Sequence, residues 1–160
     1  MATTKAILEA VASRLKGQMP GVAVELYPEN PAAWRLNHPR AALLVDYRGS
    51  KYGDVADTAF VAQGRELAIG VSVVARTLHD AYGALLLTDA ARIALLGQRW
   101  PDCRKARLSS ERFVSQEAGI WIYELVFEAE SLVVEDAEAD AGPLLKRLSV
   151  DYGFEEEMVE

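Results

Sequence analysis

The sequence predicts an α+β domain, with two helices packed on one face of a mainly antiparallel sheet of about four to five strands, plus a C-terminal extension. Apolar residues recur at helical spacing in two segments, residues 5–16 and 80–96, and alternate at the strand period through the rest of the body. The predicted strands also come in runs joined by short connections, which favours antiparallel pairing. A chain of 160 residues is long enough for one such core.

The N-terminal segment is expected to form a helix and then two strands. Residues 5–16 carry an apolar face at helical spacing, with threonines at positions 3 and 4 that can cap the helix and Gly17 as a stop. Residues 22–27 alternate between apolar and other side chains until prolines end the pattern. A second strand is expected over residues 41–47, after Pro39.

The clearest predicted strand covers residues 64–76 and has two different faces. Bulky aliphatic side chains share one face, whereas Ala68, Gly70 and Ser72 lie on the other. Small side chains allow a helix or another subunit to approach closely, and Gly70 is expected to mark a bend or a bulge. This second face is therefore a candidate subunit contact.

The remainder of the body is expected to form a helix and a hairpin. Asp80 can cap a helix that runs to about residue 96 and ends before Gly97. Residues 104–114 and 119–134 then alternate as two strands. The apolar stripe of the helix consists of Tyr82, Leu85, Leu86, Ile93 and Leu96. The core face of the last strand consists of Trp121, Tyr123, Leu125 and Phe127. The opposite face of this strand is mixed and includes Ile122 and Val126.

The charge divides the chain into a body, residues 1–134, and an extension, residues 135–160. The body carries 15 basic and 15 acidic side chains, whereas the extension carries 2 basic and 9 acidic ones, so the net charge of −7 falls on the extension. Residues 135–142 are typical of a solvated linker. The apolar residues that follow are expected to dock on a surface, and they are Leu144, Leu145, Leu148, Tyr152 and Phe154.

Few side chains are available for catalysis or metal binding, so we expect no metal or other cofactor and keep a small hydrolase only as an outside alternative. Cys103 is the single cysteine and His38 and His79 are the only histidines, which leaves no Cys/His cluster and no hydrolytic triad. Both histidines are interpreted as surface or capping residues. No apolar run approaches the length of about 20 residues that a membrane-spanning helix needs.

The stretch YRGSKYG, residues 47–53, has glycines and a lysine but lacks the spacing of a phosphate-binding loop. We interpret it as a turn after a strand, with Gly49 and Gly53 at positive φ, that opens a long connection reaching to about residue 64. Long ordered connections are often functional, and contact with a neighbouring subunit is the use we expect.

The strongest concentration of positive charge lies at residues 99–112. A solvated surface is the simplest interpretation, and pairing with an acidic patch of another subunit or contact with DNA are alternatives. A nucleic-acid-binding module would use Trp100 as a stacking residue. The acidic extension is a further candidate partner for these cations, within one chain or between subunits.

Six segments follow one another over about residues 5–134. They are AILEAVASRL, PRAALLVDYRGSKYG, QGRELAIGVSVVAR, YGALLLTDAARIALLG, RWPDCRKARLSSERFV and GIWIYELVFEAES. This ordered set resembles the tail-terminator (tail completion) family of Mu-like tailed bacteriophages and related prophages. The resemblance implies a non-enzymatic subunit of a ring, expected to be a hexamer, that caps the head-proximal end of the tail tube and ends its polymerisation. The extension lies outside this resemblance.

The resemblance also implies the partners and the place of the protein. The partners are copies of the chain, the tail tube protein and head-tail connector or neck proteins, while DNA passes the pore without specific binding. The place is the virion tail, reached from the host cytoplasm during assembly. Another neck or head-tail joining ring, the cap of a phage-derived contractile injection tube and the nucleic-acid-binding module are the alternatives.

The resemblance places the interface on particular residues. Those matching the family pattern are Tyr47, Gly49, Ser50, Tyr52, Gln63, Arg65, Arg76, Glu111, Arg112, Gly119 and Trp121. Arg48 of the YRGSKYG stretch and Arg104 and Arg107 of the basic segment are further interface candidates.

Overall fold

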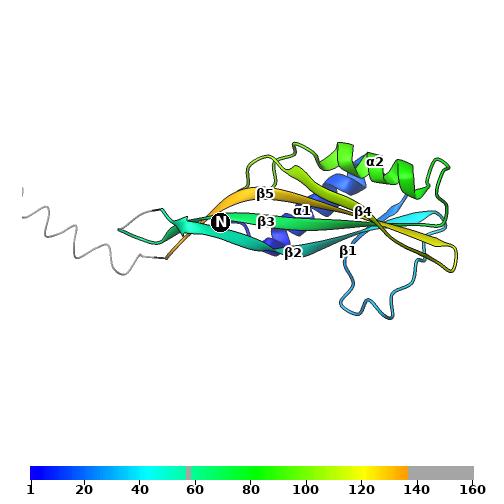
Figure 1. The fold of residues 1–160 in the computed structure, drawn as a ribbon, viewed down its shortest axis with the longest axis horizontal. Helices are drawn as coiled ribbons and strands as arrows, with labels where there is room; N and C mark the ends of the chain where they lie inside the picture. Colours follow the sequence, from blue (N-terminus) through cyan, green and yellow to red (C-terminus); the bar gives the residue numbers. More distant parts are fainter. Residues whose placement is uncertain (57–58, 137–160) are drawn as a thin grey trace, which may run out of the picture.

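The structure, a computed structural model, describes residues 1–56 and 59–136. The element order is the one that the sequence predicts, and the α+β class is confirmed (Figure 1). The predicted docking residues 144–154 lie outside the described residues. The elements are α1 (Thr4–Gln18), β1 (Ala23–Leu26), β2 (Ala41–Val55), β3 (Ala62–Ala75), α2 (Ala84–Leu95), β4 (Arg107–Glu117) and β5 (Ile120–Val134).

The five strands form one sheet in the order β1-β2-β3-β5-β4. β1 pairs in parallel with β2, and the pairs of β2 with β3, β3 with β5 and β5 with β4 are antiparallel. Both helices pack on one face, where α1 contacts α2, β1 and β2, and α2 contacts β3 and β5. The other face carries no helix from residues 1–56 and 59–136, and a loop and polar side chains lie on it.

The hydrophobic core lies between the two helices and one face of β2, β3 and β5. Successive residues of a strand point to opposite faces, so the odd-numbered positions of β3 enter the core and the even-numbered ones do not. Burial of this apolar surface is the main stabilising contribution to the fold. The largest fully buried side chains include Ile7, Leu15, Leu43, Leu67, Ile69, Leu95, Leu125 and Phe127.

The helix α1 begins as predicted but ends later. The Thr3 side chain accepts a hydrogen bond from the Ala6 N–H at 3.1 Å, which satisfies one donor of the first turn. The predicted stop at Gly17 is wrong, because the helix continues through it to Gln18. Gly17 and Gln18 are themselves exposed, but the longer helix leads to its C-cap Met19, whose side chain is buried, and it tolerates a glycine penalty of about 1 kcal/mol.

The orientation of α2 differs from the prediction. Gly83 is its N-cap, while the Asp80 carboxylate accepts hydrogen bonds from the Thr77 hydroxyl and the Tyr82 N–H in the preceding turn. The predicted apolar stripe points away from the sheet, because small side chains on the opposite side let the helix lie close to β3 and β5. The side chains that face inwards are Ala84, Leu87, Thr88, Ala91, Ala94 and Leu95.

The segment read as a long connecting loop is a strand. β2 continues through YRGSKYG to Val55 and pairs with the first half of β3, with a bulge between Tyr47 and Gly49. Gly49 has a φ of 110°, which favours glycine, whereas the positive φ expected at Gly53 is absent from the described positive-φ residues. The end of this hairpin and the end of β5 project beyond the helices as an arm (Figure 1).

The last two strands form the predicted hairpin. β4 and β5 are joined by a two-residue turn in which Ala118 and Gly119 have φ values of 52° and 77°, the conformation of a tight hairpin turn. Across the hairpin the ring of Phe113 packs edge-on against Tyr123, with centroids 5.4 Å apart. The predicted core face of β5 is confirmed, since Leu125 and Phe127 are fully buried.

Candidate functional site

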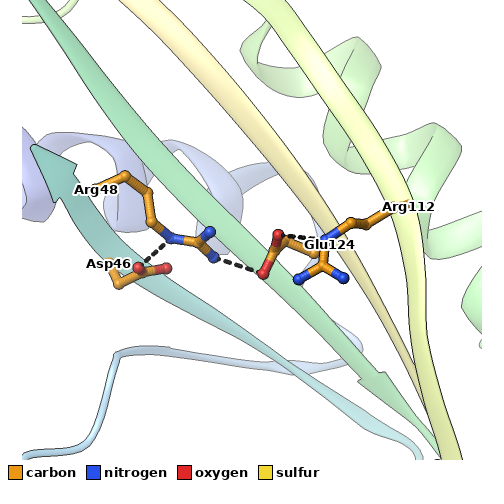
Figure 2. Close-up of polar contacts among 4 residues, drawn as sticks. All are labelled: Asp46, Arg48, Arg112 and Glu124. Carbon is orange, nitrogen blue, oxygen red and sulfur yellow. Dashed lines mark hydrogen bonds and ion pairs between the residues drawn. The ribbon is translucent and has the colours of Figure 1, made fainter.

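A row of charged side chains crosses four strands on the helix-free face of the sheet (Figure 2). Arg48 of β2 donates from Nε to Asp46 and from Nη2 to Glu124 Oε2 of β5 at 2.9 Å. Arg112 of β4 donates from Nε to Glu124 Oε1 at 3.0 Å. Glu124 therefore joins an arginine from each side and ties β2 to β4 across the sheet.

Gly70 makes this row possible. It lies on β3, the strand over which Arg48 must pass to reach Glu124, and a Cβ at this position would lie 2.6 Å from Cζ of Arg48. The strand keeps its register here, with Gly70 opposite Asp46 and Val126, so a bulge at Gly70 is wrong. The close approach that the small residue allows is made by a guanidinium of the same chain.

The charges of the row stabilise one another. The hydrogen bond from Arg48, and then that from Arg112, hold the pKa of Glu124 below its usual value. The bond to Glu124 likewise raises the pKa of Arg48. The side chains of Glu124 and Arg48 are only 15% and 29% exposed, so solvent screens this pair less than an ordinary surface ion pair.

A second polar cluster joins the base of the arm to the start of α1. Arg65 is 8% exposed and donates to Ser50 Oγ at 2.9 Å, to Thr4 Oγ1 at 2.9 Å and to the Tyr47 hydroxyl at 3.2 Å. Burial raises the pKa of Tyr47, but the bonds with Ser50 and Arg65 outweigh it and leave the pKa below its usual value. The guanidinium of Arg65 is thus used inside the subunit.

Arg76 fixes the long loop that follows β1. Its guanidinium donates to the Leu36 carbonyl at 2.8 Å and to the His38 carbonyl at 3.1 Å. His38 Nδ1 accepts from the Arg40 N–H at 3.1 Å, which confirms its interpretation as a capping residue. Between this loop and the β4–β5 hairpin lies a groove of about 540 Å³, whose lining includes Tyr27, Trp34, Leu36, Leu44, Val74, Val114, Ile120 and Ile122.

Two apolar surfaces are left open to solvent. The arm surface lies at the ends of β2 and β5 and on the residues that directly precede β3. The α2 surface is the outer side of α2, where Ile93 is 77% exposed. In the arm surface, Tyr52 and Val55 pair with odd-numbered positions of β3 and Leu132 and Val134 with even-numbered ones, so exposed apolar side chains lie on both faces of the arm. Exposed apolar side chains that gather on one part of a soluble protein mark candidate contact sites. The arm surface consists of Tyr52, Val55, Phe60, Val61, Leu132 and Val134, and the α2 surface of Tyr82, Leu85, Leu86, Ile93 and Leu96.

Comparison with known proteins gives the family. The profile of the Gp37 protein family matches residues 11–156, most of the chain. The chain belongs to the Gp37 family. Its fold is similar to that of a chain in the virion of a native gene transfer agent (GTA) particle, with a TM-score of 0.50 and 20% identity over 84% of this chain and 98% of that chain. No curated protein sequence matches the chain.

The other predicted interface residues of this Gp37-family chain lie at separate places. Glu111 of β4 pairs with Arg92 of α2 at 2.8 Å, and Trp121 packs partly buried against the core. Tyr52 is exposed on the arm, and Arg104 is exposed near the end of α2. The sequence missed the α2 surface as a contact site because the same stripe satisfies the pattern of a core-facing helix.

Arg107, also on β4, lies among three carboxylates of the helix-free face. Its guanidinium is 3.0 Å from Glu66, 3.5 Å from Glu128 and 4.0 Å from Glu130. Like Arg48 and Arg112, it is paired within the subunit, so these three arginines hold the sheet together and present little free positive charge.

The described part of the Gp37-family chain offers little for catalysis. No group of three or more His, Cys, Asp or Glu side chains within it could hold a metal ion. Burial raises the pKa of the Cys103 thiol, which makes the nucleophilic thiolate scarcer at neutral pH. Within residues 1–56 and 59–136, no helix is long and apolar enough to cross a membrane.

Proposed function

We propose that this Gp37-family chain is a structural subunit of a phage-type virion that assembles as a ring and caps the head-proximal end of the tail tube, as tail terminators do. The observation that carries the proposal is the pair of exposed apolar surfaces on a body without a catalytic constellation among its described residues. The fold shared with a GTA virion chain and the ordered resemblance to tail terminators support it.

A ring needs two different complementary surfaces on each subunit. An isologous dimer uses one patch twice, whereas a heterologous contact repeats head to tail until the rotation closes. The arm surface lies at one end of the subunit and the α2 surface towards the other (Figure 1). In the ring that we propose, the arm surface of one subunit packs against the α2 surface of the next.

The charge of the body agrees with a ring through which DNA passes. Residues 1–134 carry equal numbers of basic and acidic side chains. A strongly cationic bore would hold the phosphate backbone and release counterions, which slows passage. In the ring that we propose, tube and connector proteins contact the rims, and DNA passes through the pore unbound.

The nucleic-acid-binding alternative loses its proposed stacking residue. Trp100 is 3% exposed and cannot stack on a base, so that expectation is wrong. Arg107 and Arg112 pair with carboxylates of the same subunit. What remains of the basic stretch is Arg99, Arg104 and Lys105.

Electron microscopy of tail tubes with and without the protein tests the proposal. The wild type should add a ring of density at one tube end and stop further polymerisation of tube protein. The double variant Leu86→Asp and Ile93→Asp should lose both effects, because it places two charges on the α2 surface. The matched control, Ser13→Asp with Gln18→Asp, adds the same charge to exposed positions of α1 and should keep them.

Two results would count against the proposal. One is a protein that never associates with tube ends and never oligomerises at any concentration. The other is loss of capping in the α1 control to the same extent as in the α2 variant, because capping would then respond to net charge and not to the apolar surface.

A further inference from the structure

The sheet has two backbone edges to which no described segment adds a strand. β4 is the last strand of the sheet, so its side away from β5 is one edge, over residues 107–117. At the other side of the sheet, β1 pairs with β2 only as far as Val45, whose carbonyl also accepts from the Tyr27 N–H at 2.8 Å. The outer side of β2 over residues 46–55, which belong to the arm, is therefore the second edge (Figure 1).

Each edge presents a row of backbone groups that can pair with another strand. Within the described part of the chain, the backbone of residues 107–117 bonds only to β5 and that of residues 46–55 only to β3. Soluble proteins usually keep such edges short, because free N–H and C=O groups join readily to another chain. At 11 residues, β4 is about twice as long as the commonest strands of about 5–6 residues.

The charged side chains of the two edge strands are engaged within the subunit. Charges beside an edge strand normally discourage pairing with another chain. Here, Arg48 and Arg112 share one carboxylate of β5. Arg107 lies among glutamates of the sheet, and Glu111 pairs with α2. These charges therefore lie over the faces of the sheet and leave its edges accessible.

Helix α2 lies beside the edge of β4. The Arg92 guanidinium of α2 donates to both carboxylate oxygens of Glu111 on β4 at 2.8 Å. Leu85 and Leu96 lie seven residues before and four residues after Arg92, so they share its side of the helix. They are 39% and 51% exposed. A strand added to the edge of β4 would run beneath this part of the α2 surface.

The arm carries apolar side chains on the corresponding face. Tyr52 and Val55 pair with odd-numbered positions of β3, so they point to the side of the sheet that carries the helices. They are 54% and 52% exposed. In a sheet that continues from one subunit into the next, the helices stay on one side. Tyr52 and Val55 of the added strand would then face Leu85 and Leu96 of α2.

We propose that the β2 edge of one subunit, residues 46–55, pairs with the β4 edge of the next, residues 107–117, so that the sheet continues across the subunit boundary. The inference rests on the proposed ring and gives the backbone part of the contact between the arm surface and the α2 surface. Rotation about a ring axis preserves strand direction, and β4 is antiparallel to β2 within a subunit, so the pairing is antiparallel. Backbone hydrogen bonds supply affinity, and the apolar side chains supply specificity.

Disulfide trapping tests the pairing, because opposite residues of an antiparallel pair have Cβ atoms about 4.5–5.5 Å apart, close to the distance that a disulfide needs. Lys51→Cys on the helix-free face of β2 is combined in turn with a cysteine at each β4 position of the same face. At least one combination should give a ladder of covalent multimers on mild oxidation. The β4 positions are Arg107, Ser110, Arg112, Ser115 and Glu117.

Matched controls separate pairing from random collision. Lys51→Cys with Lys16→Cys, at an exposed position of α1, should give at least about tenfold less multimer. The wild type should give none, because Cys103 is buried. Mixing the successful pair as two single variants should stop the ladder at the dimer, since each chain then carries one engineered cysteine.

Hydrogen exchange measures the backbone bonds directly. In an antiparallel strand the N–H groups of neighbouring residues point to opposite sides, so about every second amide of each edge points outwards. On assembly of the wild type, these amides of residues 46–55 and 107–117 should exchange at least about tenfold more slowly. The loop of residues 28–37 lies outside both edges and should keep its rates.

Three outcomes would overturn the inference. Rings that cap tube ends but give no ladder from any of the five pairs and no slower exchange would keep the proposed function and remove the paired edges. Cross-links without slower exchange would show that the edges approach one another without hydrogen bonds. A protein that forms no assembly at any concentration would remove the proposed ring and this inference together.

Discussion

Replacing Glu124 by glutamine should destabilise the protein by about 1–2 kcal/mol at neutral pH. Glutamine keeps the shape of the side chain but removes the charge that two arginines share. Most of the loss comes from the bond to the half-buried Arg48 at 2.9 Å, because Arg112 is largely exposed and its pair is screened by solvent. Urea unfolding followed by circular dichroism measures it, with the melting temperature expected to fall by roughly 2–8 °C.

The effect of Glu124→Gln should depend on pH in one direction. The pKa of Glu124 is lowered in the folded protein, mainly by the bond from Arg48. A lowered carboxyl pKa contributes stability that is fully present above the unfolded value of about 4.3 and is lost as the pH falls through the folded pKa. The difference between wild type and variant should therefore be constant down to about pH 5 and shrink below about pH 4.

Glu128→Gln is the matched control, since Glu128 lies on the same face of β5 and pairs with Arg107 at the longer distance of 3.5 Å. It should cost no more than about 0.5 kcal/mol. Equal losses for Glu124→Gln and Glu128→Gln, or a Glu124→Gln loss that persists undiminished in acid, would refute the reasoning that the row of charges ties the strands together.

Three further substitutions test the packing and the polar clusters. Gly70→Ala should push Arg48 away from Glu124 and lower the free energy of unfolding in urea by about 1–2 kcal/mol. In the double variant with Glu124→Gln the two losses should not add, because both substitutions break the same contact between Arg48 and Glu124. Phe127→Ala should cost about 3–5 kcal/mol by the same measurement, since the ring is fully buried. Tyr47→Phe should cost about 0.5–1.5 kcal/mol and remove from the ultraviolet titration a tyrosine that ionises below the usual pKa.

Local patterns predicted the fold because the strands and helices of this chain bury one face each. The alternation over residues 64–76 and the aromatic face of the last strand reappear as β3 and β5, with Leu125 and Phe127 in the core. The order of the elements followed directly from the changes of period along the chain.

Helix α2 shows where a pattern stops being informative. It is apolar on nearly all sides, so the larger side chains of Leu86 and Ile93 suggested the core face, whereas small residues such as Ala91 occupy it. Close packing of the helix against the sheet favours the small side chains inside. A helix that is apolar all round indicates that its outer side is covered by a partner, as its inner side is covered by the sheet, and this pattern is visible in the sequence.

The arm and the row of charges depended on contacts distant in sequence. YRGSKYG contains turn-forming residues, yet β3 offers it a partner strand, and a bulge at Gly49 absorbs the irregularity. Arg48 and Glu124 lie 76 positions apart and meet only because β3, with Gly70 between them, is the shared neighbour of β2 and β5. No local pattern contains that information.

The central claim is that copies of the chain meet head to tail through the arm surface and the α2 surface. The most direct test uses two double variants, an arm variant with Val55→Asp and Val61→Asp and an α2 variant with Leu86→Asp and Ile93→Asp. Light scattering measures the molar mass of each variant alone and of an equimolar mixture of the two. Each variant alone should stay monomeric, and the mixture should form a dimer that grows no further, because one intact arm can meet one intact α2. A mixture that stays monomeric while the wild type oligomerises would contradict the account.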